Sequence, residues 1–358
     1  MARQGSLFEP AHGPGADHLS GAPAPPGRQT RASATIAPAE PPPTLAALAQ
    51  RLPARLHLGT SSWSFPGWAG LVYADAASEA VLARRGLPAY VAHPLFRAVG
   101  IDRTFYAPID ADAFAAYARQ IGPDRADFAC LIKAPMMLTA VRLRDESGRW
   151  CDNDAFLDAR LARTQFVEPA LAGLGTLCGP LVFQFPPLPM SLRRNPLAFA
   201  DRLAEFLLAL PRLPTGFPHA CYAVELRDPD LLTDDYLAAL CAGGATHCLA
   251  IHARMPALAD QLRYWREASA SPLVIRWSLH SGLRYEEAKE RYAPFDRIVD
   301  EDPDGRAAIS EAVFAAVARG QSAVVIVNNK AEGSAPQSIV RLAQLIADHG
   351  ATIVAPGR

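Results

Sequence analysis

Three consecutive stretches decide the fold: LVFQF at residues 181–185, LAFADRLAEFLLAL at 197–210 and YAVEL at 222–226. The first and third are short and apolar at consecutive positions, as strands buried on both faces of a parallel sheet are. The middle stretch has the apolar spacing of an amphipathic helix. Together they predict a strand, a crossover helix and a second strand parallel to the first.

The same alternation repeats from about residue 52 to residue 357. Further helical text occupies 155–171, 236–242 and 338–349. Eight strand–helix units predict an α/β fold, a single (β/α)8 TIM barrel. An open doubly wound sheet is the alternative, but the first strand is followed by Gly59-Thr60-Ser61-Ser62-Trp63, which is not a glycine-rich nucleotide-binding turn. The eight predicted strands are Leu56–Thr60, Val99–Phe105, Phe128–Lys133, Leu181–Phe185, Tyr222–Leu226, His247–Ile251, Leu273–Trp277 and Ala323–Val327.

Residues 1–50 differ from the rest of the chain, because they contain nine of its 32 prolines and few large apolar side chains. Such a composition buries too little apolar surface to offset the entropy of ordering, so we predict a disordered Pro/Ala-rich tail. Within it, Gln4-Gly5-Ser6-Leu7-Phe8 resembles the pentapeptide by which bacterial replication and repair proteins dock onto the sliding clamp. Gln4, Leu7 and Phe8 would make that contact, and a segment without function is the alternative.

Composition narrows the possible functions. The formal charge is −1, which argues against a nucleic-acid binder that works by charge alone. Six cysteines without a C-x-x-C pair indicate reduced core residues, and no stretch resembles a membrane span or a secretory signal, so we expect a cytoplasmic protein. His252 and His280 have no second histidine at ligand spacing, so we expect neither a metal nor a cofactor.

The carboxyl ends of the strands are where a TIM barrel carries its chemistry. Glu225 and Arg227 stand two residues apart, so both side chains would enter the barrel mouth from the same strand. Glu225 is a candidate general acid or base, although a buried structural ion pair is the alternative. Lys133 is the second catalytic candidate, since only three of the 35 basic residues are lysine and a lysine has a tunable pKa.

The other strand ends supply candidates for binding the substrate. Arginines would hold an anion, aromatic rings would stack on a sugar or base, and amides would orient polar groups. Trp63 and the asparagines also fit structural roles, in the core and in a turn. The candidates are Trp63, Asp102, Tyr106, Gln184, Arg227, Arg276, Asn328 and Asn329.

Six of these blocks, in this order, resemble the YecE-like family, catalogued as domain of unknown function 72. The resemblance runs from about Leu56 to Ile346 and implies a TIM barrel, but no activity. It rests on Gly59-Thr60-Ser61-Ser62-Trp63, Thr104-Phe105-Tyr106, Lys133-Ala134-Pro135, Gln184-Phe185-Pro186-Pro187, Ala223-Val224-Glu225-Leu226-Arg227 and Asn328-Asn329.

Two segments depart from the family pattern. The family usually has Glu-Ile-Asn-x-Thr-Phe-Tyr at the second strand, where this chain has Gly100-Ile101-Asp102-Arg103 before Thr-Phe-Tyr. The seventh strand usually ends Arg-x-His-Gly, whereas Arg276 here is followed by Trp277-Ser278-Leu279-His280 and a charged insertion to about residue 305.

These residues support an enzyme that acts on an anionic, phosphate-bearing substrate, such as a small molecule or nucleic acid, at the barrel mouth by metal-independent acid/base chemistry. A glycoside hydrolase with Asp102 and Glu225 as paired carboxylates is one alternative. A barrel that binds a ligand or partner without catalysis is another. A Schiff base at Lys133, and hence a lyase, is a third.

Overall fold

The computed structural model describes residues 35–268, 272–280 and 282–354. The chain divides into two units, Met1–Thr35 and Ile36–Arg358, and every element below belongs to the second. Residues 1–34 of the predicted tail, with the clamp-like Gln4, Leu7 and Phe8, lie outside the described residues.

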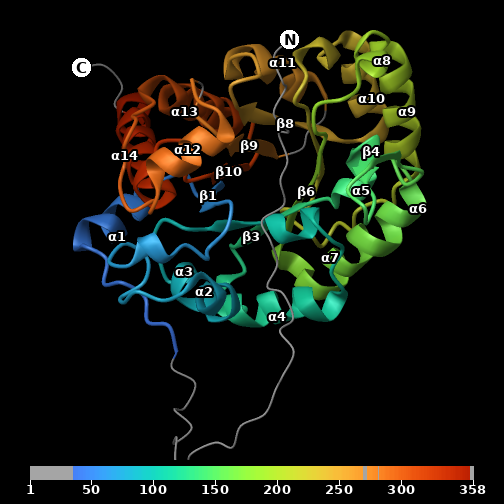
Figure 1. Cartoon of the computed structure of the whole chain (residues 1–358). Helices are drawn as coiled ribbons and strands as arrows, with labels where there is room; N and C mark the ends of the chain where they lie inside the picture. Colours follow the sequence, from blue (N-terminus) through green and yellow to red (C-terminus); the bar gives the residue numbers. More distant parts are fainter. Residues whose placement is uncertain (1–34, 269–271, 281, 355–358) are drawn as a thin grey trace, which may run out of the picture. The chain divides into compact units, whose positions relative to one another are not determined.

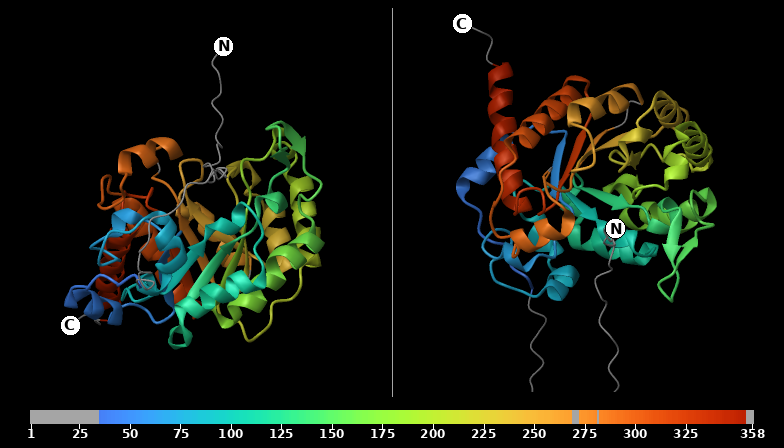
Figure 2. Two further views of the ribbon diagram at one scale, coloured as in Figure 1. Left: turned by 60° about the horizontal axis from the view of Figure 1, so that its bottom comes forward. Right: turned by 45° about the horizontal axis from the view of Figure 1, so that its top comes forward.

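Eight parallel strands close into a barrel in the order β1-β10-β9-β8-β7-β6-β3-β2, and the barrel is surrounded by helices (Figures 1 and 2). The pairing of β1 with β10, from Leu56 opposite Ala323 to Thr60 opposite Val327, closes the ring. The predicted TIM barrel is therefore confirmed. The strands are β1 Leu56–Thr60, β2 Ala98–Ile101, β3 Ala129–Lys133, β6 Cys178–Gln184, β7 Tyr222–Glu225, β8 Thr246–Ile251, β9 Leu273–Trp277 and β10 Ala323–Val327.

The outer helices begin where the sequence supplies caps. The side chains of Asp110, Asn195, Thr233 and Asp302 accept hydrogen bonds from backbone N–H groups in the first turns of α4, α9, α10 and α13. The helix predicted over 155–171 is divided into α6 Ala159–Ala162, a π-helical turn η4 Arg163–Val167 and α7 Glu168–Leu174. The other helices of the ring are α2 Glu79–Arg85, α3 Leu87–Val91, α4 Ala111–Ile121, α9 Pro196–Ala209, α10 Asp234–Gly243, α11 Leu258–Ala268, α13 Pro303–Ala318 and α14 Ala335–Val354.

Short elements lie in the loops that follow strands. The hairpin of β4 Arg142–Arg144 and β5 Trp150–Asp152 follows β3, and α12 Tyr285–Tyr292 follows β9 within the charged insertion. Both project from the same end of the barrel (Figure 2). Helices α5 Met136–Thr139 and α8 Met190–Arg193 occupy the loops after β3 and β6.

The core has two layers, because successive residues of a strand point to opposite faces. Small and branched side chains fill the barrel interior, and larger ones pack outward against the helices. Four of the six free cysteines are buried as predicted, but Cys151 and Cys241 are exposed, which corrects the expectation that all six lie in the core. The interior side chains are Ala98, Ala129, Leu131, Val182, Cys221, Ala223, Cys248, Val274, Val324 and Ile326.

Two boundaries correct the sequence prediction. The predicted tail, residues 1–50, is too long, because residues 43–50 form helix α1, Pro43–Gln50. Leu48 of this helix is buried, and Arg51 pairs with Asp348 of α14 at 2.7 Å. Proline is favoured at the first position of a helix, so a proline-rich composition does not by itself exclude a helix here. The predicted strand Val99–Phe105 ends at Ile101, and a 3-10 turn, η2 Asp102–Phe105, follows it.

Glycine is required where β1 and β2 meet. A Cβ atom on Gly59 would lie 1.9 Å from the carbonyl oxygen of Ala98, so a larger residue would force the two strands apart. In the part of the chain that the structure describes, no helix combines the length and apolarity needed to cross a membrane.

Candidate functional site

Arg276 is the centre of the barrel mouth. It is the penultimate residue of β9, and its Nη1 donates hydrogen bonds to Oε2 of Glu225 at 2.6 Å and to Oε1 of Gln184 at 2.9 Å. Its Nη2 lies 3.4 Å from both carboxylate oxygens of Asp102. One guanidinium therefore connects the ends of four strands, β9, β7, β6 and β2, and brings four predicted site residues together.

Glu225, the last residue of β7, is fully buried and pairs with Arg227 as well as with Arg276. Burial by itself would raise the pKa of the Glu225 carboxyl, but the two guanidinium groups outweigh burial and lower this pKa to about 2. The carboxylate is therefore charged at neutral pH, and it anchors two arginines at the mouth.

Lys133, the last residue of β3, is only 8% exposed. Its ammonium lies 3.5 Å from the centre of the Phe105 ring. Thr104 holds the η2 turn, which contains Phe105, against β3 by donating a hydrogen bond to the Lys133 carbonyl at 2.6 Å. Among the described residues, no carboxylate lies within 4.0 Å of this ammonium. Burial lowers the pKa of Lys133 to about 8, and the carboxylate of Asp102 opposes that shift in part.

Positive charge exceeds negative charge at this mouth. Among the residues that the structure describes, Lys133, Arg227 and Arg276 face two carboxylates, Asp102 and Glu225. In the described structure the Nη1 group of Arg227 is buried without a hydrogen-bond partner. Buried donors without acceptors are costly, so the mouth is suited to receive an anion.

Two tyrosines and a second lysine form the rim of the mouth. Tyr106 follows the η2 turn and is 76% exposed, and Tyr285 of α12 is 51% exposed. Lys330, after β10, is 7% exposed, and its ammonium lies 4.2 Å from the centre of the Tyr285 ring. The insertion that departs from the family pattern thus supplies an aromatic side chain to the rim.

Three candidates have structural contacts instead. Trp63 is buried, its indole N–H donates to the Leu82 carbonyl at 3.1 Å, and its ring packs edge-on against Tyr117, so its assignment as a stacking platform is corrected to a core role. The Asn329 oxygen accepts from Trp68 at 3.2 Å and from the Ala335 backbone at 2.8 Å, which places it at the start of α14.

Asn328 connects the first and last strands of the barrel. Its amide donates to the Ser61 hydroxyl at 2.8 Å, and its oxygen accepts from the Lys330 backbone at 2.9 Å. It shapes the turn that holds Lys330, which is the turn role that its sequence context also allowed.

Asp228 is a structural residue that sequence reasoning missed. It is buried and accepts a hydrogen bond from the Leu188 backbone at 2.6 Å, and Arg254 and Arg193 pair with it at 3.1 and 3.5 Å. It therefore ties together the loops that follow β6, β7 and β8. The sequence signal that could have indicated Asp228 is its position directly after Glu225-Leu226-Arg227, at the end of a strand.

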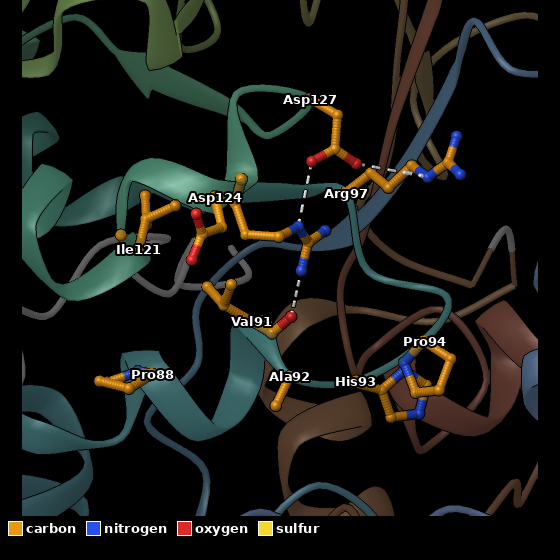
Figure 3. A pocket seen from close by; sticks show the side chains of 11 residues that line it. Pro88, Val91, Ala92, His93, Pro94, Arg97, Ile121, Asp124 and Asp127 are labelled. Atoms are coloured by element: carbon orange, nitrogen blue, oxygen red, sulfur yellow. Dashed lines mark hydrogen bonds and ion pairs between the residues drawn. The ribbon is translucent and has the colours of Figure 1, made fainter.

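A pocket of about 480 Å3 lies near the opposite ends of the strands (Figure 3). Three of its charged groups pair with one another: Arg125 donates to Asp127 at 3.0 Å and Arg97 lies 3.6 Å from the same carboxylate. Arg125 also donates to the carbonyls of Val91 and Phe96. That end of a TIM barrel serves stability, so we do not assign the site to this pocket.

A closed (β/α)8 barrel with a cationic mouth places the protein among TIM-barrel proteins. Residues 57–357 match the family described as "Protein of unknown function DUF72", and the chain belongs to this family. A search of curated proteins gives no match. In the residues described here, no group of three or more His, Cys, Asp or Glu side chains is placed to hold a metal ion.

Solved structures of the same family have the same fold. A DUF72 family protein from Enterococcus faecalis V583 has 16% identity and a TM-score of 0.55, with 81% of this chain and 95% of that chain covered. A DUF72 family protein from Thermotoga maritima MSB8 has 19% identity and a TM-score of 0.53, with 81% of this chain and 98% of that chain covered. At these identities the likeness is one of fold.

Proposed function

We propose that this chain is an enzyme that binds a phosphate-bearing anion at the barrel mouth and moves a proton there with Lys133. The observation that carries the proposal is a pair of buried cationic groups: among the described residues the Arg227 Nη1 group has no hydrogen-bond acceptor, and the Lys133 ammonium contacts the Phe105 ring but has no carboxylate within 4.0 Å. Oxygens of a phosphate group would satisfy both, in the way that charge-assisted hydrogen bonds do.

Lys133 suits proton transfer better than Glu225 does. A general acid or base works best when its pKa lies near the operating pH, and burial brings the pKa of Lys133 to about 8. The Lys133 ammonium would donate a proton to the leaving oxygen, which keeps the electron pair of the broken bond, and the resulting amine would take up the proton that the attacking water releases. Glu225, with its pKa at about 2, would instead hold Arg227 and Arg276 in place.

The arrangement of Arg276 disfavours glycoside hydrolysis. Asp102 and Glu225 would have to flank a scissile bond, but both bind the same guanidinium, at 3.4 and 2.6 Å. A neutral sugar also gains little from a mouth with excess positive charge. A phosphate-bearing substrate uses the same charges productively.

The test is calorimetric titration of the full chain with inorganic phosphate, in the wild type and in Lys133→Met. We expect saturable binding that weakens by about tenfold to a hundredfold in the variant, since one charge-assisted hydrogen bond contributes about 1.5–3 kcal/mol. Arg212→Met is the matched control, because it removes one exposed cation and leaves the mouth intact. No binding by the wild type, or equal weakening in the control, would overturn the proposal.

A second arm addresses a nucleic acid as the substrate. Fluorescence anisotropy of a labelled single-stranded oligonucleotide reports whether a phosphodiester chain binds, and a decrease with salt measures the phosphates engaged. Phosphate binding without oligonucleotide binding would point to a small molecule.

A further inference from the structure

All three lysines of this arginine-rich chain gather around the mouth. Lys133 ends β3, Lys330 follows β10, and Lys289 lies on α12, where its charge acts on Lys330 and lowers the pKa of that residue. The remaining 32 basic residues are arginines distributed over the chain. A lysine presents a compact ammonium that can contact one phosphate oxygen, and burial shifts its pKa more readily than that of a guanidinium.

Lys330 resembles Lys133 in its contacts with aromatic rings. Its ammonium lies over aromatic rings, 4.2 Å from the centre of Tyr285 and 5.8 Å from that of Phe295, as Lys133 lies over Phe105. Among the described residues no carboxylate lies within 4.0 Å of it. Burial lowers the pKa of Lys330 to about 8 and the charge of Lys289 adds to that shift, so this ammonium too gains from an anionic partner.

The charge of Asp102 acts on both lysines and on the two exposed tyrosines. Its carboxylate acts on the ammonium groups of Lys133 and Lys330, and on the hydroxyls of Tyr106 and Tyr285. The Asp102 side chain is 31% exposed, and the Arg276 guanidinium lies at 3.4 Å from its carboxylate, which is a long contact for an ion pair. It can therefore accept a hydrogen bond from a hydroxyl group of a ligand that reaches from one lysine to the other.

We propose that Lys330 forms a second anion subsite, and that the ligand is a sugar with two phosphate groups, one at Lys133 and Arg227 and the other at Lys330. The sugar hydroxyl would donate to Asp102, and a planar ring on the sugar would stack on the exposed face of Tyr106. This inference rests on the proposed function, because it takes the Lys133 subsite as the place of the first phosphate.

The experiment compares adenosine 3′,5′-bisphosphate with adenosine 5′-monophosphate in calorimetric titrations of the full chain. We expect the wild type to bind the bisphosphate about tenfold more tightly, the gain of one further charge-assisted contact. In Lys330→Met this ratio falls to about 1, and in Lys330→Arg it is partly retained. Arg212→Met, with its exposed cation removed, keeps the wild-type ratio.

The outcomes separate the two proposals. Equal affinity of the wild type for both nucleotides, or an unchanged ratio in Lys330→Met, overturns the second subsite while the proposed function stands. No binding of either nucleotide or of inorganic phosphate overturns both. A 5′-phosphorylated trinucleotide that binds more tightly than the bisphosphate, with the same loss in Lys330→Met, assigns the second phosphate to a nucleic-acid strand.

Discussion

The two ends of this barrel both contain buried or half-buried arginines beside carboxylates, yet the two clusters differ in their balance. At the amino end, the guanidinium of Arg125 is fully engaged by Asp127 and two backbone carbonyls. At the carboxyl end, the described residues place no carboxylate within 4.0 Å of the Lys133 ammonium, which lies over the Phe105 ring, and no hydrogen-bond acceptor at Nη1 of Arg227. The comparison teaches that a polar cluster which satisfies itself stabilises the fold, whereas one with unmatched charge is where a ligand is to be sought.

The largest expected effect on stability comes from removing the buried negative charge of the carboxyl-end cluster. Glu225→Gln leaves Arg227 and Arg276 without their shared charge, and breaking a buried pair in this way costs about 3–5 kcal/mol. Urea unfolding of both proteins measures this loss. A loss below about 1 kcal/mol would mean that the cluster is not held together by Glu225.

The amino-end cluster should respond in stability alone. Arg125→Met removes the hydrogen bonds to Val91, Phe96 and Asp127 and should lower the free energy of unfolding by about 2 kcal/mol. Phosphate affinity should not change. A variant that lost phosphate binding while remaining folded would contradict the assignment of the two ends.

The two buried lysines should destabilise the folded protein less in alkali, while buried thiols, whose pKa values burial raises, act in the opposite direction. Their folded pKa values are lowered to about 8, from the ordinary value of 10.5, so the unfolded state binds more protons between these pH values. The contribution of each lysine to stability therefore rises as the pH increases from 8 to 10.5, by an amount on the order of 2 kcal/mol. Urea unfolding of the wild type and of Lys133→Met at pH 7 and pH 10 tests this, because the free energy of unfolding of the wild type minus that of the variant should increase by that amount between the two pH values.

The smallest effect distinguishes a core tryptophan from a ligand platform. Trp63→Phe loses the hydrogen bond to Leu82 and should lower the free energy of unfolding by about 1 kcal/mol. Nucleotide affinity in the same titrations should equal that of the wild type. A tenfold weaker affinity at unchanged stability would return Trp63 to the binding surface.

The sequence predicts the barrel well because its strands are buried on both faces and therefore show as unbroken apolar runs. It also predicts the quartet of Gln184, Glu225, Arg276 and Asp102, since all four stand at strand ends. It does not separate Trp63 or Asn329 from these residues, because a position in the chain does not reveal whether a side chain points into the mouth or into the core. Tyr285 lies in an insertion with no strand to place it, and Asp228 acts through loop contacts that only the folded chain brings together.

The connections made by Arg276 have a kinetic consequence. Its partners Glu225, Gln184 and Asp102 lie 51, 92 and 174 residues away along the chain, so the cluster has a high contact order. Contacts of this kind form after local ones, because closing long loops costs entropy first. The mouth is thus assembled only when the ring of strands is complete. A bound phosphate, which requires that assembly, would slow unfolding more than it speeds folding.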